Sequence, residues 1–138
     1  MRIEQTRDLE TCRALRRAVF IDEQSIPEAE EWDGLDDGAL HFLALRDGRA
    51  IGTARILIQG DTGKIGRVCV LSEARGTGVG AALIRAALDV LRVQPGVTRA
   101  KLGSQTHAIG FYEKLGFAAY GDIYDDAGIP HRDMVRDL

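Results

Sequence analysis

Residues 75–81 of this 138-residue chain read Arg-Gly-Thr-Gly-Val-Gly-Ala, and they stand between an apolar strand pattern and a long helical pattern. Glycines at 76, 78 and 80 let the backbone come close to a ligand. The first amides of a helix have no partner within the helix, and the positive end of its dipole lies beside them. The turn is therefore a candidate phosphate site, with a tight turn that serves only packing as the alternative.

Two common phosphate-binding patterns can be tested against this turn. The Walker pattern ends in Gly-Lys-Ser/Thr, which is missing here. The dinucleotide pattern G-x-G-x-x-G/A is matched by Gly76, Gly78 and Ala81, and it predicts an acid about 20 residues further on. The strand expected there carries Arg99 and Lys101 instead, and hairpins precede the turn, which argues against a dinucleotide site.

Apolar periodicity and turn residues predict the elements on both sides of this turn. Asp47-Gly48 indicates a tight hairpin, and Gly116 is expected to end the last helix. We expect helices at 7–21, 76–92 and 108–115, and strands at 1–5, 39–45, 50–58, 64–71, 98–103, 117–124 and 129–135. This order predicts a single α/β domain over residues 1–138, with a mixed sheet flanked by helices.

Composition excludes several classes of protein. The net charge of −3 and a pI near 5.6 provide no positive field that would gather nucleic acid. No apolar stretch exceeds four residues, so we expect no membrane span, and no signal peptide pattern opens the chain. Cys12 and Cys69 lack a CxxC or Cys/His companion, so we expect no metal site, no disulfide scaffold and a cytoplasmic location.

Charge is unevenly distributed along the chain. Residues 22–38 contain eight acids and no base, so the remainder of the chain carries +5. Such a run is either a solvated loop or an electrostatic rim that attracts a cationic ligand.

Two motifs resemble those of the GNAT acetyltransferases. Arg75, Gly78 and Gly80 match the R/Q-x-x-G-x-G/A signature, and residues 111–117, Phe-Tyr-Glu-Lys-Leu-Gly-Phe, look like the F-Y-x-K-x-G-F segment of the family. Residues 19–24, 33–34, 52–55, 66–68, 105 and 128–131 are similar to the ElaA-like branch. The resemblance implies a GNAT fold with a mostly antiparallel sheet. An Asn that is common in the family near the end of its strand is replaced here by Ser104-Gln105-Thr106-His107.

The resemblance implies transfer of an acetyl group from acetyl-CoA to a primary amine of a small molecule or peptide. A non-catalytic acyl-CoA-binding module is the alternative. Family members often dimerise, so a homodimer is open, although no residue pattern indicates an interface. The N–H of Val70 is expected to support the oxyanion. The implied cofactor-binding residues are Val68, Cys69, Val70, Arg75, Gly76, Thr77, Gly78, Val79, Gly80, Ala81 and Phe111.

The same resemblance implies roles for polar residues outside the glycine turn. Tyr112 is carried over as the general acid, with a core aromatic as the alternative. Glu23 and His131 rank first as the base that takes the proton of the amine, ahead of His107 and Asp33. A small thiol in a strand is typical of packing, so Cys69 is not expected to be a nucleophile. The candidate substrate residues are Asp33, Arg55, Arg67, Gln105 and His107.

One further expectation comes from strand register. A symmetric hairpin around Asp61 places Arg55 opposite Arg67 on one face of the sheet. Like charges that face each other need a shared anion. Acids of this chain are one source of that anion, and a carboxylate on the substrate is the other.

Overall fold

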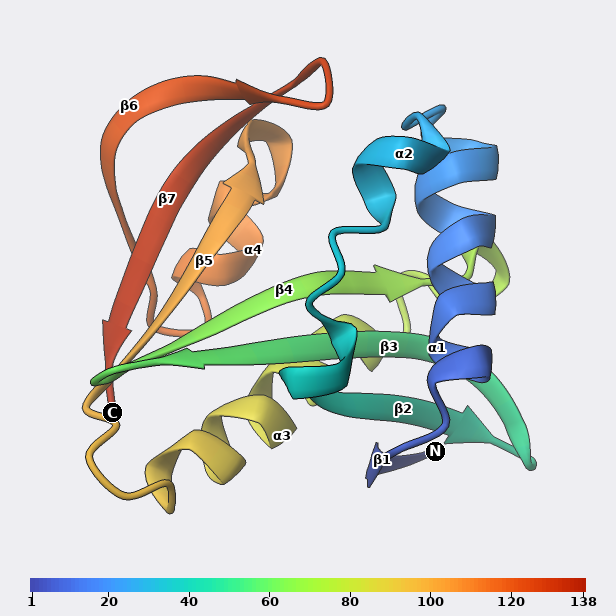
Figure 1. Cartoon of the computed structure of the whole chain (residues 1–138), viewed down its shortest axis with the longest axis horizontal. Coiled ribbons are helices and arrows are strands. Elements are labelled where there is room, and N and C mark those ends of the chain that lie inside the picture. Colours follow the sequence, from blue (N-terminus) through green and yellow to red (C-terminus); the bar gives the residue numbers. More distant parts are fainter.

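The computed structural model describes residues 1–138, and its elements follow the order expected from the sequence (Figure 1). The helices are α1 (Leu9–Arg16), α2 (Glu28–Glu31), α3 (Val79–Arg92) and α4 (Ile109–Glu113), and a π-helical segment, η1 (Arg17–Glu23), continues α1. The strands are β1 (Arg2–Thr6), β2 (Leu40–Arg46), β3 (Arg49–Gln59), β4 (Thr62–Val70), β5 (Arg99–Gln105), β6 (Ala118–Asp126) and β7 (Ile129–Asp137).

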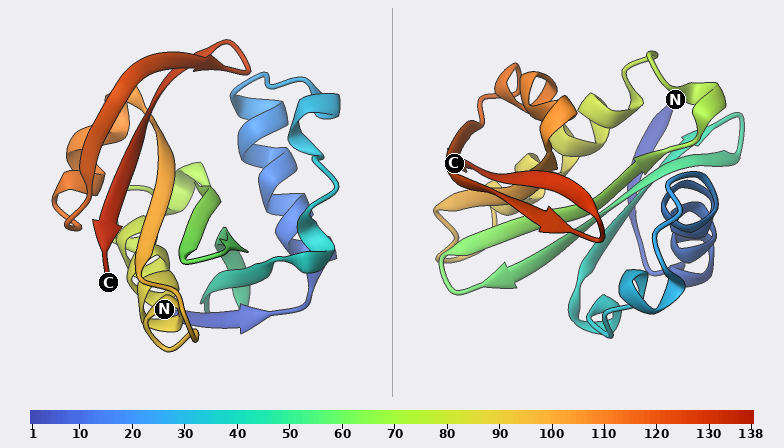
Figure 2. Two further views of the ribbon diagram at one scale, coloured as in Figure 1. Left: turned by 60° about the vertical axis from the view of Figure 1, so that its left-hand side comes forward. Right: turned by 90° about the horizontal axis from the view of Figure 1, so that it is seen from above.

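All strands belong to one sheet in the order β1-β2-β3-β4-β5-β7-β6. Only the β4–β5 pair is parallel, so the expected mixed and mostly antiparallel sheet is confirmed. Helices α1 and α2 cover one face, and α3 and α4 lie on the other (Figure 2).

Helix α3 forms the larger core with the sheet. Its buried residues recur every three or four positions, which places them on one side of the helix, facing β2–β5: Val79, Leu83, Ile84, Ala87, Leu88 and Leu91. Gly63 of β4 permits this contact, because a Cβ there would lie 2.2 Å from a methyl group of Leu91. A smaller cluster under α1 contains Cys12, Leu15, Val19, Leu43 and Cys69.

Strands β4 and β5 separate soon after they begin. Their parallel register covers only Thr62–Lys64 with Arg99–Lys101, at the closed end of the pair. Beyond these residues the two strands diverge, as Figure 1 shows. The sheet is thus split into β1–β4 and β5–β7 at its open end.

The first helix differs from the expected one at its C-terminal half. Instead of a single helix over 7–21, α1 ends at Arg16 and the chain widens into the π-helical η1. The N–H of Gln24 donates to the carbonyl of Val19, five residues earlier. Sequence periodicity did not predict this change, and π-helical turns are frequent at functional sites.

Two hairpin predictions have different outcomes. Asp47 and Gly48 both adopt positive φ, as the expected tight turn requires. The expected pairing of Arg55 with Arg67 is wrong, because Arg55 pairs with Gly66. Between Thr53 and Arg55 the register shifts at a bulge that gives β4 one extra residue. Arg67 lies in this bulge and has a φ of 51°.

The acids of residues 22–38 are largely bound by arginines of this chain, in what we call the arginine–carboxylate network. Asp36 accepts hydrogen bonds from Arg13 at 3.0 Å, Arg16 at 2.8 Å and Arg55 at 3.1 Å. Asp33 accepts from Arg55 at 2.7 Å. This network ties the segment before β2 to α1 and β3.

Glu31 joins the network to β4. It pairs with Arg16 at 3.0 Å and with Arg67 at 2.9 Å. Arg67 also reaches Asp33 at 3.3 Å, so the anion that Arg55 and Arg67 share is a carboxylate of this chain. No helix here is long and apolar enough to cross a membrane.

Replacing Asp36 is expected to destabilise the fold. Asp36→Asn removes the counter-charge that Arg13, Arg16 and Arg55 share and leaves Arg13 with none, and breaking a buried ion pair costs about 3 kcal/mol or more. Urea denaturation measures the loss. Asp37→Asn is the matched control, because Asp37 is exposed. Equal stability of the two variants would contradict a role for the network.

The network also predicts loss of stability in acid. Burial raises the pKa of Asp36, but hydrogen bonds from Arg16 and Arg13 outweigh this and lower it to about 2. The hydrogen bond from Arg55 lowers the pKa of Asp33. In the folded protein the pKa values of both acids lie below the unfolded value of about 3.9. Their contribution to stability is therefore complete above about pH 3.9 and is lost as the pH falls towards 2. Thermal melts between pH 5 and pH 2 should show a decline, and a smaller one in Asp36→Asn.

Candidate active site

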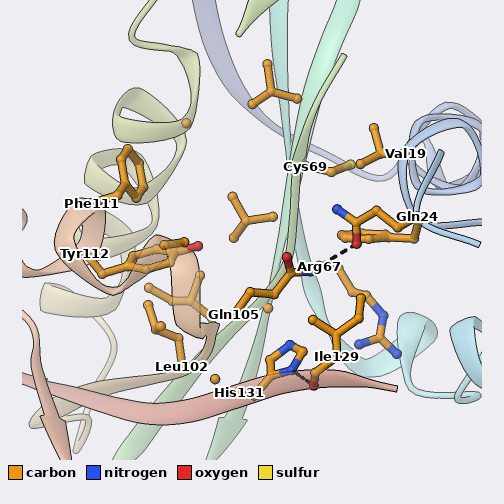
Figure 3. Close-up of a pocket in the computed structure, with 18 of the residues that line it drawn as sticks. Val19, Gln24, Arg67, Cys69, Leu102, Gln105, Phe111, Tyr112, Ile129 and His131 are labelled. Atoms are coloured by element: carbon orange, nitrogen blue, oxygen red, sulfur yellow. Dashed lines mark hydrogen bonds between the residues drawn. The ribbon is translucent and has the colours of Figure 1, made fainter. Parts of the chain in front are cut away.

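The divergence of β4 from β5 opens a cavity of about 940 Å³. This volume suits a ligand of cofactor size. Its walls come from η1, β4, the glycine turn, the start of α3, the end of β5, α4 and the β6–β7 hairpin. Figure 3 shows Tyr112 and Phe111 on one side, His131 and Ile129 below them, and Gln24 on the side of η1.

The glycine turn borders one end of the cavity. Gly76 and Gly78 have φ values of 74° and 87°, which side chains strongly disfavour. The amides of Val79, Gly80 and Ala81 begin α3 and have no acceptor within it. Six of the seven residues of the turn line the cavity: Arg75, Gly76, Gly78, Val79, Gly80 and Ala81.

Two further expected cofactor residues, Phe111 and Thr77, differ in their position relative to the cavity. Phe111 is partly exposed and closes the cavity beside Gly80, since a Cβ on Gly80 would lie 3.3 Å from its ring. Thr77 does not line the cavity, because its hydroxyl donates to the carbonyl of Ala74 and accepts from Arg46.

The edge of β4 offers backbone groups to the cavity. The N–H of Leu71 donates to Ile51 of β3, so alternation along the strand turns the N–H groups of Val70 and Val68 away from β3. Strand β5 has already diverged there, and those N–H groups face the opening. The carbonyl of Val70 accepts a hydrogen bond from Arg75 at 3.1 Å.

Arg75 and Glu23, which both line the cavity, bind each other. The guanidinium makes two hydrogen bonds to the carboxylate, of 2.6 and 2.7 Å. The hydrogen bond from Arg75 holds the pKa of Glu23 below its usual value. Glu23 is thus an ionised partner of Arg75, and Arg75 carries its positive charge next to a negative one.

Tyr112 points its hydroxyl into the cavity (Figure 3). Its ring packs edge-on against Phe111 and Phe117, at 5.0 and 6.2 Å between centroids. Burial raises the pKa of Tyr112 to about 12, so the phenol stays protonated at physiological pH. Tyr112 combines features of the two alternatives, general acid and core aromatic. Its ring packs on the core, and its hydroxyl is a hydrogen-bond donor in the cavity.

His131 lies opposite, on β7, with a defined tautomer. Its Nδ1 lies 2.8 Å from the carbonyl of Ile129. A carbonyl only accepts, so Nδ1 carries the hydrogen and neutral His131 has a free lone pair on Nε2. The ring stacks on Tyr124, whose hydroxyl donates to Asp133 at 2.7 Å.

Cys69 lines the cavity but is almost fully buried. Burial, followed by the nearby charge of Glu31, raises the pKa of its thiol to about 12. A nucleophile requires the thiolate, so this environment favours the packing role.

Three polar side chains form a chain of hydrogen bonds through the cavity. Gln105 donates to Gln24 at 3.0 Å and accepts from His107 at 2.7 Å. The candidate residues Gln105 and His107 are therefore brought together. Gln24 was not among the candidates, because nothing in its surrounding sequence indicates that η1 turns it inward.

The remaining candidates belong to the arginine–carboxylate network. Asp33 and Arg55 do not line the cavity, and they bind each other. Arg67 lines it while pairing with Glu31 and Asp33. No group of three His, Cys, Asp or Glu side chains is arranged to hold a metal ion.

A family model described as the acetyltransferase (GNAT) family matches residues 6–117. The chain belongs to the GNAT acetyltransferase family. Among its relatives is the Escherichia coli protein ElaA, 34% identical over 128 residues that cover 90% of this chain and 84% of ElaA.

Solved GNAT structures share the whole fold. The crystal structure of Escherichia coli ElaA superposes with a TM-score of 0.89 at 30% identity, covering 99% of both chains. An acyl-CoA N-acyltransferase from Pseudomonas aeruginosa gives 0.87 at 31% identity, also covering 99% of both chains. A GNAT acetyltransferase from Elizabethkingia anophelis with acetyl-CoA bound shares the fold at a TM-score of 0.75 and 16% identity, covering 99% of this chain and 97% of that one.

Membership of the GNAT family confirms the resemblance carried by the glycine turn and by residues 111–117. It also removes the dinucleotide alternative, since the turn follows a strand of a mostly antiparallel sheet. GNAT acetyltransferases transfer an acetyl group to an amine.

Proposed function

We propose that residues 1–138 act as one domain that transfers the acetyl group of acetyl-CoA to a primary amine of a small molecule or peptide. One observation carries this proposal. A single cavity gathers an anion-binding turn, the free strand edge at Val70, a protonated phenol at Tyr112 and a histidine base at His131.

The donor side of the cavity suits a CoA thioester. When bound, acetyl-CoA supplies an activated acetyl group on a sulfur leaving group. The amides at the start of α3 would hold its pyrophosphate, and the edge of β4 from Val70 to Val68 would bind the pantetheine arm. The N–H of Val70 would stabilise negative charge on the reacting carbonyl oxygen.

His131 is the better candidate for the base that takes the proton of the amine. Its Nδ1 is bound to Ile129, which leaves Nε2 free to accept a proton. The carboxylate of Glu23 already has a cationic partner, and its lowered pKa makes it a weak base. Because Arg75 is neutralised by Glu23, we assign phosphate binding mainly to the backbone amides of the turn.

Tyr112 would assist the departing thiolate by donating a hydrogen bond. Its pKa of about 12 exceeds the value of about 8.5 for an ordinary thiol. Complete proton transfer from the phenol would therefore be uphill by about 5 kcal/mol. We propose that Tyr112 stabilises the thiolate and keeps its proton until solvent protonates the sulfur.

The acceptor side favours a cation. Glu30 and Asp126 line the cavity mouth without an ion-pair partner, so they would attract an ammonium group. Five other acids of residues 22–38 are bound by arginines, so their charges are already compensated.

Thermal unfolding with acetyl-CoA tests the donor assignment. Acetyl-CoA at 100 times its Kd should add about 2.7 kcal/mol to the stability, which raises the melting temperature by roughly 5 to 12 °C. NAD is the control and should produce no shift. A shift with NAD but none with acetyl-CoA would overturn the proposed function. Thiol release in the presence of a panel of primary amines then separates an enzyme from a binding module.

Variants of Tyr112 and His131 test the two catalytic roles. Tyr112→Phe should lower kcat about 100-fold with little change in the Kd for acetyl-CoA. Tyr120→Phe is the matched control, because Tyr120 lies on β6 outside the cavity. His131→Gln should lower kcat/KM about 100-fold, because the neutral amide of glutamine does not take the proton of the amine. Unchanged turnover in either variant removes that role.

A further inference from the structure

The hydrogen bonds among Gln24, Gln105 and His107 cross the middle of the cavity. Figure 3 shows the amide of Gln105 extending from β5 to Gln24, with Tyr112 on one side of it and His131 and Ile129 on the other. We call the Gln24–Gln105 pair the amide bridge. It separates a donor side, which contains the glycine turn and Tyr112, from an acceptor side, which contains His131.

Both ends of the amide bridge stand on ordered backbone. Gln24 directly follows η1. Its N–H donates to the carbonyl of Val19, and the N–H of Ile26 donates to the carbonyl of Phe20. Gln105 is the last residue of β5 and pairs with His131 on β7. His107 holds the carbonyl oxygen of the Gln105 side chain, which leaves its amide nitrogen to face Gln24.

The bridge is also the one side-chain hydrogen bond that joins η1 to β5 across the cavity. The polar side-chain contacts between the two parts of the sheet, Arg99 with Thr62 and Thr98 with Asp61, lie at the closed end. Because η1 contacts β4, the amide bridge connects the β4 side of the cavity to the end of β5.

We propose that the amide bridge limits the acyl group that the enzyme accepts, and that Gln24 and Gln105 are specificity-determining residues. The inference rests on the proposed function. An arm laid along β4 from the glycine turn directs its acyl end from Val70 towards Arg67, and the side chain of Gln105 enters this same cavity from β5 to reach Gln24. A two-carbon group ends before the bridge, whereas each added methylene meets it.

A longer acyl chain has to open the bridge. Opening breaks the bond between the two amides and leaves polar groups facing an apolar chain in a half-buried place. The loss of a hydrogen bond with unpaired partners reduces binding by about tenfold or more.

Binding of CoA, acetyl-CoA and hexanoyl-CoA, measured by calorimetry, tests the proposal without a known acceptor. Wild type should bind acetyl-CoA at least about tenfold more tightly than hexanoyl-CoA. Gln105→Ala and Gln24→Ala should each bring this ratio close to one while leaving the Kd for CoA unchanged. Gln59→Ala is the matched control, because Gln59 is exposed on β3 and does not line the cavity.

The outcomes are distinguishable. Selectivity that persists in both alanine variants, with CoA bound normally, overturns the role of the bridge and leaves the proposed function standing. Equal weakening of all three ligands also overturns it, because the bridge would then only brace the fold. If wild type binds none of the three, the proposed function and the bridge fail together.

Discussion

The early separation of β4 from β5 is the constraint on which the site depends. A parallel pair that continued to the ends of both strands would satisfy the N–H groups of Val68 and Val70 and leave no cavity. Pairing over only Thr62–Lys64 and Arg99–Lys101 keeps the halves together while exposing a strand edge in the middle of the sheet. Such an edge can accept an extended ligand arm as an additional strand.

The arginine–carboxylate network complements this opening on the acceptor side. The segment from η1 to β2, residues 24–39, forms one wall beside the cavity. It has only four residues of regular α-helix, in α2, and buries few apolar side chains. Arg16, buried among Glu31, Asp36 and Trp32, binds that wall to α1 by ion pairs and a cation–π contact at 5.2 Å. Buried ion pairs contribute little net stability compared with apolar packing, but they define one geometry. The proposed acceptor side of the cavity would benefit from that rigidity.

The sequence predicted the order of elements, the glycine turn and the aromatic helix, because periodicity and glycine placement are local signals. It failed where one residue changes the geometry. The bulge at Arg67 moved Arg55 from its expected partner, and the π-helical turn of η1 brought Gln24 inward. The acidic run could not be interpreted from its letters alone, since its arginine partners lie far away in sequence. For Arg55 the sequence left two partners open, an acid of this chain or a carboxylate of the substrate, and the structure pairs it with Asp33.

The π-helical segment also makes the lining of the cavity depend on the number of residues in η1. Residues 17–23 hold one more residue per turn than an α-helix would accommodate, as the bond from Gln24 to Val19 shows. Deleting any one of these residues would restore ordinary winding and rotate the chain after the deletion by about 100°. Glu23 and Gln24 would then leave the cavity even if both letters were retained. Among related sequences, a single gap in this segment would therefore indicate a cavity with a different lining, even where no substitution is seen.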